Sequence, residues 1–432
     1  MNKNNGSNHL AVLVTGGRIP FQRSMTGYRD LSAFNLSRMA LEGLITKTGI
    51  KPSTIDQVIM GTVIQDVNTS NIAREAALGA GIPDTVPAYT TNMACISSNI
   101  AITSAVEQIQ TGQHNVIIAG GVETMSDIPI RFKKKFRQKL LDARKYKSPT
   151  DFLKFFKGLR PSDLLPDIPS ISEYSTGETM GSSCDKMAAK YGISRGEQDE
   201  YALRSHQKAA EATEKGLLED ELFPATLPPD FESILQDNTF RADSTLEKLS
   251  QLKPAFVKKY GTVTAGNSSA LTDGASATLI TNLQAADKHG WQPKAAFRTY
   301  TYVAQQPDEE LLIGPAIAVP KVLDQMGLTL NDIDVFEFHE AFAGQILTVL
   351  KALNSKAFAR ERLNRPDKVG EIPMEKFNSW GGSLSLGHPF GATGARLITT
   401  AANRLHKEDG QFALIAACAA GGQGHALILE RI

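Results

Sequence analysis

A few cysteine and histidine side chains stand out because each lies in a stretch of small residues or glycines. The chain has only three cysteines and eight histidines. Cys95 begins a helical pattern, and Cys418 ends an apolar run before two alanines and two glycines. His388 lies between Gly387 and Pro389. Thiols beside an imidazole provide a nucleophile and a base. These residues therefore predict one thiol-based active site assembled from both halves of the sequence.

Cys95 follows a short extended segment, so its thiol is expected at the N-terminus of a helix. The positive end of the helix macrodipole and its unpaired N–H groups stabilise a thiolate and lower the pKa of the thiol. This placement predicts a nucleophile that attacks a carbonyl or thioester carbon. Cysteine is also a common small buried residue, so a structural role fits the local pattern equally. Cys184 has no such context and is predicted to be structural.

Three other residues are candidates for moving protons and binding an oxyanion. His388 lies in a glycine-rich stretch, 381–394, and is suited to deprotonate a nearby cysteine; alternatively, it caps its own loop. Cys418 enters a turn whose free N–H groups suit an oxyanion hole and whose thiol suits proton transfer, although a core cysteine at a strand end fits equally. His339 and Glu340 follow an apolar strand, where they either face a ligand crevice or form a surface pair.

The elements that must position these residues follow a repeated α/β pattern. Residues 49–58 align without a gap to residues 327–336, and in both copies a helical pattern precedes the glycine and a strand follows. More loosely, a helical pattern and then an apolar strand follow both Cys95 and His388. Alternating strands and helices predict βαβ units in a sheet that is covered on both faces. We therefore predict a duplicated α/β fold.

The stretch 131–260 interrupts the repeat and is rich in proline and charge, so it is interpreted as an inserted, mainly helical loop domain. The predicted N-terminal domain then comprises 1–130 and 261–285, and the C-terminal domain comprises 286–432. Arg131 to Arg160 carries twelve Lys or Arg against two Asp, with apolar residues at helical spacing. This basic segment is either a peripheral membrane or partner surface, or a helical hairpin that packs on its own domain.

The overall composition excludes several classes of protein. The formal net charge is zero, which gives no field that favours nucleic acid. No Walker loop and no Cys/His pair at zinc spacing occurs, so neither a nucleotide site nor a metal site is predicted. Three cysteines indicate reduced thiols rather than a disulfide framework. No signal peptide or membrane span is predicted.

Five segments together resemble the thiolase family, and the resemblance runs from Arg18 to Glu430. They are the Cys95 segment, the stretch 261–275, the tetrad beginning at His339, the loop at His388 and the turn after Cys418. The resemblance implies two βαβαβαββ halves that form a five-layered α-β-α-β-α core, with an inserted loop domain. It also implies an acyltransferase that works through a covalent cysteine acyl-enzyme.

The resemblance also implies roles for single residues. Cys95 would take the acyl group, His388 would activate it, and Cys418 would move the α-proton of acetyl-CoA. One oxyanion hole would combine His388 with a water held by His339, and the other would use the backbone N–H groups of Cys95 and Ala420. Coenzyme A and acyl-CoA would be substrates, with no other cofactor and no metal. The implied coenzyme A contacts are Arg241, Lys248, Ser269 and Met180.

Two departures from the commonest thiolase pattern narrow the subgroup. Many thiolases have Asn where this chain has His339, and Gly where it has Ala420. Both departures, and the basic insertion, are similar to the thiolase (beta) subunits of trifunctional fatty-acid-oxidation complexes. This implies cleavage of 3-ketoacyl-CoA in β-oxidation, a homodimer, a hydratase/dehydrogenase alpha subunit in an alpha2beta2-type complex, and peripheral membrane contact through 131–160. The compartment would be the bacterial cytoplasm, or the mitochondrial matrix and inner-membrane surface after removal of a transit peptide.

Three other functions fit parts of the same pattern. A biosynthetic acetoacetyl-CoA thiolase would use the same scaffold and the same reactive residues. A non-catalytic acyl-CoA or lipid-binding relative would have no need of two thiols and two histidines. A condensing enzyme acting on acyl-carrier protein typically lacks the second cysteine, so Cys418 disfavours it.

Overall fold

The computed structural model describes residues 9–167 and 172–432. These residues divide into two compact units, one formed by 9–127 together with 172–432 and the other by 128–167. Each unit is considered by itself. Among the described residues, no helix combines the length and the apolar character needed to cross a bilayer.

The first half of the larger unit contributes five neighbouring strands to a sheet. Their spatial order is β1 (Ala11–Arg18), β10 (Thr272–Asn282), β5 (Val116–Glu123), β3 (Gln57–Gly61) and β4 (Ala88–Thr91). The first three of these pair antiparallel, and β5, β3 and β4 pair parallel. The helices of this half are α1 (Ala33–Thr48), α2 (Ile72–Gly79) and α3 (Ser97–Gln110).

The second half repeats this arrangement. Its strands lie in the order β11 (Ala295–Ala304), β14 (Gln423–Arg431), β13 (Phe412–Ala419) and β12 (Val335–Phe338), with the same pattern of antiparallel and then parallel pairing. A single parallel bridge between Phe336 and Phe377 stands where the first half has β4. The halves join where β1 pairs antiparallel with β11. The predicted duplicated fold class is confirmed.

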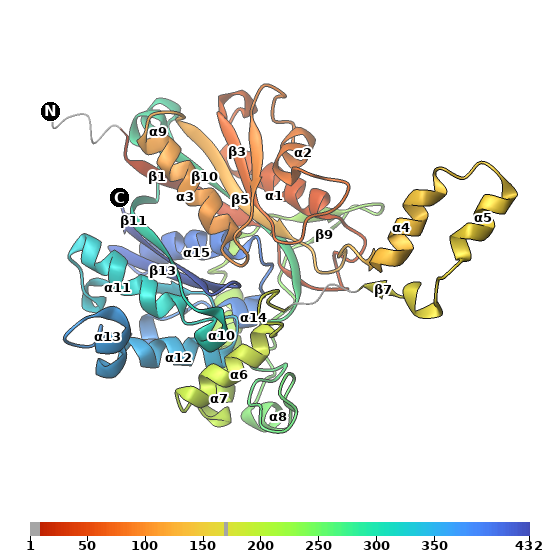
Figure 1. The fold of residues 1–432 in the computed structure, drawn as a ribbon. Coiled ribbons are helices and arrows are strands. Elements are labelled where there is room, and N and C mark those ends of the chain that lie inside the picture. The colour runs from red at the N-terminus through yellow and green to blue at the C-terminus, as the bar shows by residue number, and fades with distance from the viewer. Residues whose placement is uncertain (1–8, 168–171) are drawn as a thin grey trace. The chain divides into compact units, whose positions relative to one another are not determined.

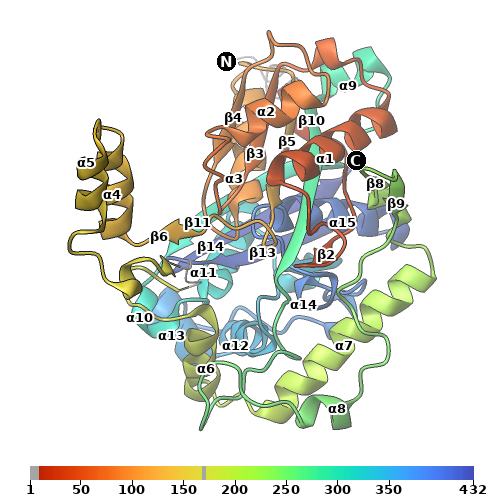
Figure 2. The same cartoon turned by 90° about the vertical axis from the view of Figure 1, so that its right-hand side faces the viewer.

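The core is arranged in five layers, which Figures 1 and 2 show from two sides. Along β5, Val116 and Ile118 pack with α1 and α2, whereas Ile117 and Ala119 pack in a central cluster. That central cluster contains α3 and α15 (Thr393–Lys407) together with strands from both halves. On the far side, α11 (Gly314–Met326) and α12 (Ala343–Leu353) cover the second half. Alternate strand residues therefore face opposite helical layers.

The glycines that begin the two gapless repeat copies adopt the expected conformation. Gly49 ends α1 with φ 62°, and Gly327 ends α11 with φ 66°, both in the left-handed region. Only glycine adopts this conformation without a steric cost from Cβ. In each copy one short 3₁₀ turn, at Pro52–Thr54 and at Leu330–Asp332, then leads into a parallel strand.

Residues 172–260 form helices that share a core with the second half. Buried residues of α6 (Met180–Lys190) and α7 (Arg195–Glu214) pack in one cluster with α11 and α12. The predicted domain boundaries at 130/131, 260/261 and 285/286 stay predictions. The remaining described strands and α-helices of this unit are β2 (Gln22–Arg23), β8 (Ala225–Leu227), β9 (Glu232–Ile234), α8 (Leu246–Ser250), α9 (Leu283–His289), α10 (Pro307–Glu310), α13 (Lys356–Leu363) and α14 (Ser383–Leu386).

The smaller unit is a helical hairpin, drawn in yellow in Figure 1. Its helices are α4 (Lys134–Ala143) and α5 (Pro149–Phe156), and its ends pair as β6 (Arg131–Phe132) with β7 (Pro166–Asp167). Edge-to-face ring contacts join Phe136 of α4 to Phe132 and to Phe155 of α5, and the second contact holds the two helices together. No residue of α4 is buried.

Candidate active site

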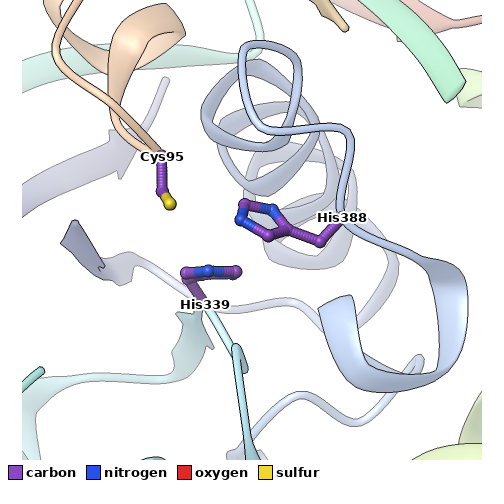
Figure 3. Close-up of side chains that lie close together, drawn as sticks. All are labelled: Cys95, His339 and His388. Carbon is purple, nitrogen blue, oxygen red and sulfur yellow. The ribbon is translucent and has the colours of Figure 1, made fainter. Parts of the chain in front are cut away.

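Cys95, His339 and His388 converge from three separate segments of the chain (Figure 3). One nitrogen of each histidine and the Cys95 sulfur all lie within 4.8 Å of one another. The two imidazole rings are 4.0 Å apart between centroids, at an interplanar angle of 41°. The expected meeting of a thiol and an imidazole from the two halves of the sequence therefore occurs.

The backbone around Cys95 turns sharply just before α3. Ala94 has φ 46°, a left-handed conformation that costs a non-glycine residue roughly 1–3 kcal/mol. The Ser97 hydroxyl accepts a hydrogen bond from the N–H of Met93 at 2.9 Å and donates one to the carbonyl of Ala94 at 2.7 Å. These two bonds stabilise the turn and hold the thiol beside the first turn of the helix.

The two histidines are held in place by bonds to neighbouring elements. The His339 N–H donates to the carbonyl of Ala416 at 2.8 Å, which extends the β12–β13 pairing one residue beyond the strand. The His388 N–H donates to the Thr272 hydroxyl at 3.2 Å. Gly387, with φ 95°, precedes it, and a Cβ there would lie 2.8 Å from Thr272. Glycine is therefore required at this close approach.

Hydrogen bonds to Thr393 define the tautomer of His388. The Thr393 hydroxyl donates to the carbonyl of Pro389 at 3.0 Å and lies 2.6 Å from Nδ1 of His388. A hydroxyl has one proton, so Thr393 accepts from Nδ1–H and the proton of the neutral ring is on Nδ1. The Nε2 atom is buried and has no partner within the described structure. Burial, His339 and Arg396 hold the pKa of His388 well below its usual range, which leaves Nε2 free to accept a proton.

His339 is completely buried and anchored through its other ring nitrogen. Its Nδ1 lies 2.9 Å from the Ser383 hydroxyl, and its Nε2 has no partner in the described part of the chain. Burial, followed by the charge of Arg396, lowers the pKa of His339 to about 3. His339 is therefore a neutral imidazole beside the Cys95 thiol.

The prediction that the pKa of Cys95 is lowered is wrong. Burial raises the pKa of this half-buried thiol to about 11, and the carboxyl group of Glu123 adds to the rise. The backbone N–H groups of Ala420 and of Cys95 itself act on the sulfur in the opposite direction but are outweighed. Desolvation thus exceeds the effect of the helix N-terminus. The resting nucleophile is a thiol that must lose its proton during attack.

Cys418 is the next-to-last residue of β13, which pairs parallel with β12, so Cys418 and His339 both lie at the carboxyl ends of parallel strands. Its side chain is buried, and burial raises the pKa of the thiol well above its usual value. The Cys95 and Cys184 thiols add to this rise. Cys418 is thus a protonated thiol, two residues before Ala420, whose backbone N–H acts on the Cys95 sulfur.

Residues that hold the site together were missed by the reasoning from sequence. Glu123 accepts from the N–H groups of Val63, Ile64 and Gly391 at 3.1, 2.9 and 3.0 Å, and burial raises its pKa to about 7. It connects the loop after β3 to the loop that carries His388. A carboxylate at the end of an otherwise apolar strand was the available signal.

Three further supporting residues also escaped the reasoning from sequence. They are Thr393 and Ser383, each bonded to a site histidine, and Arg396, which donates to Ser383. Nothing in the local sequence distinguishes Arg396 from an ordinary exposed helical arginine. Its contacts become visible only when α15 is placed in the central layer.

Of the predicted coenzyme A contacts, Ser269 lies beside the His339 segment. Its N–H donates to the carbonyl of Ala341 at 3.0 Å. Arg241 and Lys248 are exposed, and Lys248 pairs with Asp243 at 2.8 Å. Met180 begins α6 and is half-buried against the core of the second half. These four residues lie outside the cluster of Cys95 and the two histidines.

Cys95 and the two histidines have the atom types of a metal site, but their surroundings oppose a cation. Burial lowers the pKa of both histidines, and the positive charge of the fully buried Arg396 lowers it further. The same charge repels a metal ion at these nitrogens. The arrangement instead suits covalent chemistry, with a thiol nucleophile, a neutral base and hydrogen-bond donors around the reacting carbon.

Comparison with known proteins identifies the class. The family model "Thiolase, N-terminal domain" matches residues 11–284, and "Thiolase, C-terminal domain" matches residues 291–431. The chain belongs to the thiolase family, and the predicted family and acyltransferase class are confirmed.

Individual relatives agree with this class. The chain is 56% identical to the mitochondrial trifunctional enzyme subunit beta of Bos taurus, over 97% of the chain and 88% of that protein. It is 43% identical to a 3-ketoacyl-CoA thiolase of Yersinia enterocolitica, over 97% of the chain and 96% of that protein. The crystal structure of human mitochondrial 3-ketoacyl-CoA thiolase in complex with CoA superposes with a TM-score of 0.83 at 31% identity, covering 98% of the chain and 99% of the human protein.

Proposed function

We propose that this chain is a 3-ketoacyl-CoA thiolase of fatty-acid β-oxidation. It cleaves 3-ketoacyl-CoA with coenzyme A to give acetyl-CoA and an acyl-CoA shortened by two carbons. The observation that carries this proposal is the cluster of Cys95, His339 and His388. The chain is 43% identical to a protein named 3-ketoacyl-CoA thiolase and 56% identical to a trifunctional enzyme subunit beta. Coenzyme A and acyl-CoA are its substrates, and the chemistry requires no metal or other cofactor.

In the first half-reaction the Cys95 sulfur attacks the ketone carbon while its proton passes to Nε2 of His388. The bond between the second and third carbons breaks, the acyl group stays on Cys95, and the acetyl-CoA enolate takes a proton from Cys418. The raised pKa of both thiols supports this order, because each starts with its proton. Proton transfer from His388 to Cys418 resets both groups.

In the second half-reaction coenzyme A attacks the Cys95 thioester. His388 accepts the proton of the coenzyme A thiol and returns one to the Cys95 sulfur as it leaves, so protons balance over the cycle. The N–H groups of Cys95 and Ala420 both act on the Cys95 sulfur, which supports an oxyanion hole at the acyl carbonyl. His388, once protonated, and a water held by His339 form the second oxyanion hole.

Substrate binding uses the four residues named from the family resemblance. Arg241 and Lys248 are exposed and carry the charge that suits the phosphates and adenine of coenzyme A. The N–H of Arg241 donates to the buried His206 at 3.2 Å, which supports a fixed backbone there. Ser269 and Met180 would contact the pantetheine, and the bond from Ser269 to Ala341 keeps that contact close to the His339 segment.

Thiolysis across chain lengths tests the function directly. With 3-ketoacyl-CoA substrates of four, ten and sixteen carbons, we expect kcat/KM for ten carbons to exceed that for four at least about tenfold, since each added buried CH₂ contributes about 0.8 kcal/mol. Loss of the thioester-enolate absorbance measures cleavage. A preference for four carbons would instead identify an acetoacetyl-CoA thiolase, and absence of coenzyme A-dependent cleavage would identify a non-catalytic binding protein.

The assembly is proposed to be a homodimer that joins an alpha subunit with hydratase and dehydrogenase activities. The edge strand β4 supports the homodimer, because its residues are half-buried and, among the described strands, it pairs only with β3. An unpaired strand edge is a natural site for association with a second chain. The alpha subunit is supported by the beta-subunit name of the bovine relative. The proposed compartment is the mitochondrial matrix face of the inner membrane or the bacterial cytoplasm.

The hairpin 128–167 is proposed to contact an anionic membrane surface. It exposes Leu153 and Phe156, at 72% and 70%, among the twelve basic residues counted between 131 and 160. Basic charge next to exposed apolar side chains is the combination that binds the surface of an anionic bilayer.

Vesicle binding of hairpin variants tests this contact. In the variant with Leu153→Glu and Phe156→Glu, binding to vesicles that contain anionic phospholipid should weaken at least about tenfold, because two apolar side chains no longer enter the bilayer. Cosedimentation measures binding, and unchanged thiolysis shows that the larger unit is intact. The control, Leu235→Glu with Leu283→Glu, adds the same charge at exposed sites outside the hairpin. Equal binding by both variants would contradict the membrane contact.

A further inference from the structure

We propose that Ser383 and Arg396 are positioning residues that hold His339 as its Nε2–H tautomer, so that this histidine donates a hydrogen bond in the active site. The inference rests on the proposed roles of His339 and His388 in the reaction. It adds a reason why two adjacent neutral imidazoles perform different tasks.

The argument starts from the protons around the Ser383 hydroxyl. Ser383 Oγ lies 2.7 Å from Nη2 of Arg396 and 2.9 Å from Nδ1 of His339. A guanidinium only donates, so one lone pair of the hydroxyl is occupied by Arg396. Within the described ranges, the hydroxyl proton has no other acceptor than Nδ1 of His339. Ser383 therefore donates to Nδ1, and the single proton of the neutral ring is on Nε2.

The charge around this network keeps the ring neutral. Arg396 and Arg404 are both fully buried, and they share the carboxyl group of Glu337 at 3.4 and 2.8 Å. Arg404 is also paired with Glu408 at 2.9 Å, so Arg396, whose contact with Glu337 is the longer of the two, is the positive charge that acts on His339. An imidazolium there would add a further positive charge without solvent, which is unfavourable.

His388 has the opposite arrangement. Thr393 accepts from its Nδ1–H, which leaves the Nε2 lone pair free. The two rings, 4.0 Å apart, therefore present a donor and an acceptor in the neighbourhood of the Cys95 sulfur, as the orientation in Figure 3 allows. Two hydroxyl groups, one that donates and one that accepts, decide which histidine is the base.

The need for Ser383 as a hydrogen-bond partner is specific to a histidine at position 339. A histidine has two neutral tautomers, so it needs a fixed partner to present N–H rather than a lone pair. An asparagine amide has no neutral tautomers, so no partner is needed to decide which of its atoms carries a proton. Ser383 should therefore matter when residue 339 is histidine and should matter little when it is asparagine.

Double-mutant kinetics test this dependence. In the wild-type background, Ser383→Ala should lower kcat of thiolysis about 10- to 100-fold and change KM less than about twofold. Losses of this size are typical when the partner of a histidine's second ring nitrogen is removed. In the His339→Asn background the same substitution should change kcat less than about twofold. Ser385→Ala is the matched control, since Ser385 is equally buried on α14 but bonds Ser205 and Gly382 instead of a site histidine.

Nitrogen NMR of the ¹⁵N-histidine-labelled wild-type protein reads the tautomers without any measurement of activity. The His339 signals are those that disappear in His339→Asn. We expect protonated Nε2 at His339 and protonated Nδ1 at His388, with a shift of His339 toward Nδ1–H in Ser383→Ala. A wild-type His339 protonated on Nδ1, or equal kinetic losses in both backgrounds, would overturn the inference. A wild-type protein without thiolysis but with these tautomers would contradict the proposed function alone.

Discussion

Replacing Cys95 with serine is expected to abolish acyl-enzyme formation and to lower kcat of thiolysis about 10,000-fold or more. The substitution preserves size, so the turn at Ala94 and the start of α3 remain. A serine hydroxyl is a far weaker nucleophile than a thiol that loses its proton to His388. Removing the nucleophile of a catalytic unit typically costs this much or more.

Intact-protein mass spectrometry after incubation with an acyl-CoA donor measures the adduct. The wild-type protein should gain the mass of one acyl group and Cys95→Ser should gain none. Cys184→Ala is the matched control, because it removes a buried thiol that lies outside the cluster of Cys95, His339 and His388. An acyl adduct that persists in Cys95→Ser would place the nucleophile elsewhere.

Replacing Cys418 with alanine is expected to separate the two halves of the chemistry. Acylation of Cys95 by a saturated acyl-CoA moves a proton only between Cys95, His388 and the leaving coenzyme A, so it should continue. Cleavage of 3-ketoacyl-CoA requires a proton for the acetyl-CoA enolate, and its kcat should fall about 1,000-fold, within the range for a lost general acid.

Exchange of the acetyl-CoA methyl protons with deuterium in D₂O, followed by proton NMR, measures proton transfer at the α-carbon alone. The wild-type protein should catalyse the exchange and Cys418→Ala should not, although the variant still forms the acyl-enzyme. Normal turnover or normal exchange by this variant would remove Cys418 from the mechanism. The pair of variants thus assigns one thiol to the acyl group and the other to the α-proton.

Much of the fold follows from local patterns. The gapless match of 49–58 to 327–336 reports two helix ends with left-handed glycines, and both occur at Gly49 and Gly327. The helical pattern expected after Cys95 runs to Gln110. These features were predictable because helix propensity, glycine conformation and strand hydrophobicity act over a few neighbouring residues.

The amino-acid sequence by itself determined which reactive groups exist and that both halves of the chain must bring them together. Only the tertiary structure decided the protonation state and the hydrogen-bond partners of these groups. Cys95 appears activated when a helix N-terminus is considered alone, but burial by the surrounding chain raises its pKa to about 11. Segments that are far apart in the sequence pack against one another in the folded chain. This packing brings the site into contact with Ser383, Arg396 and Glu123. Desolvation and hydrogen-bond partners depend on these long-range contacts, which local residue patterns do not contain.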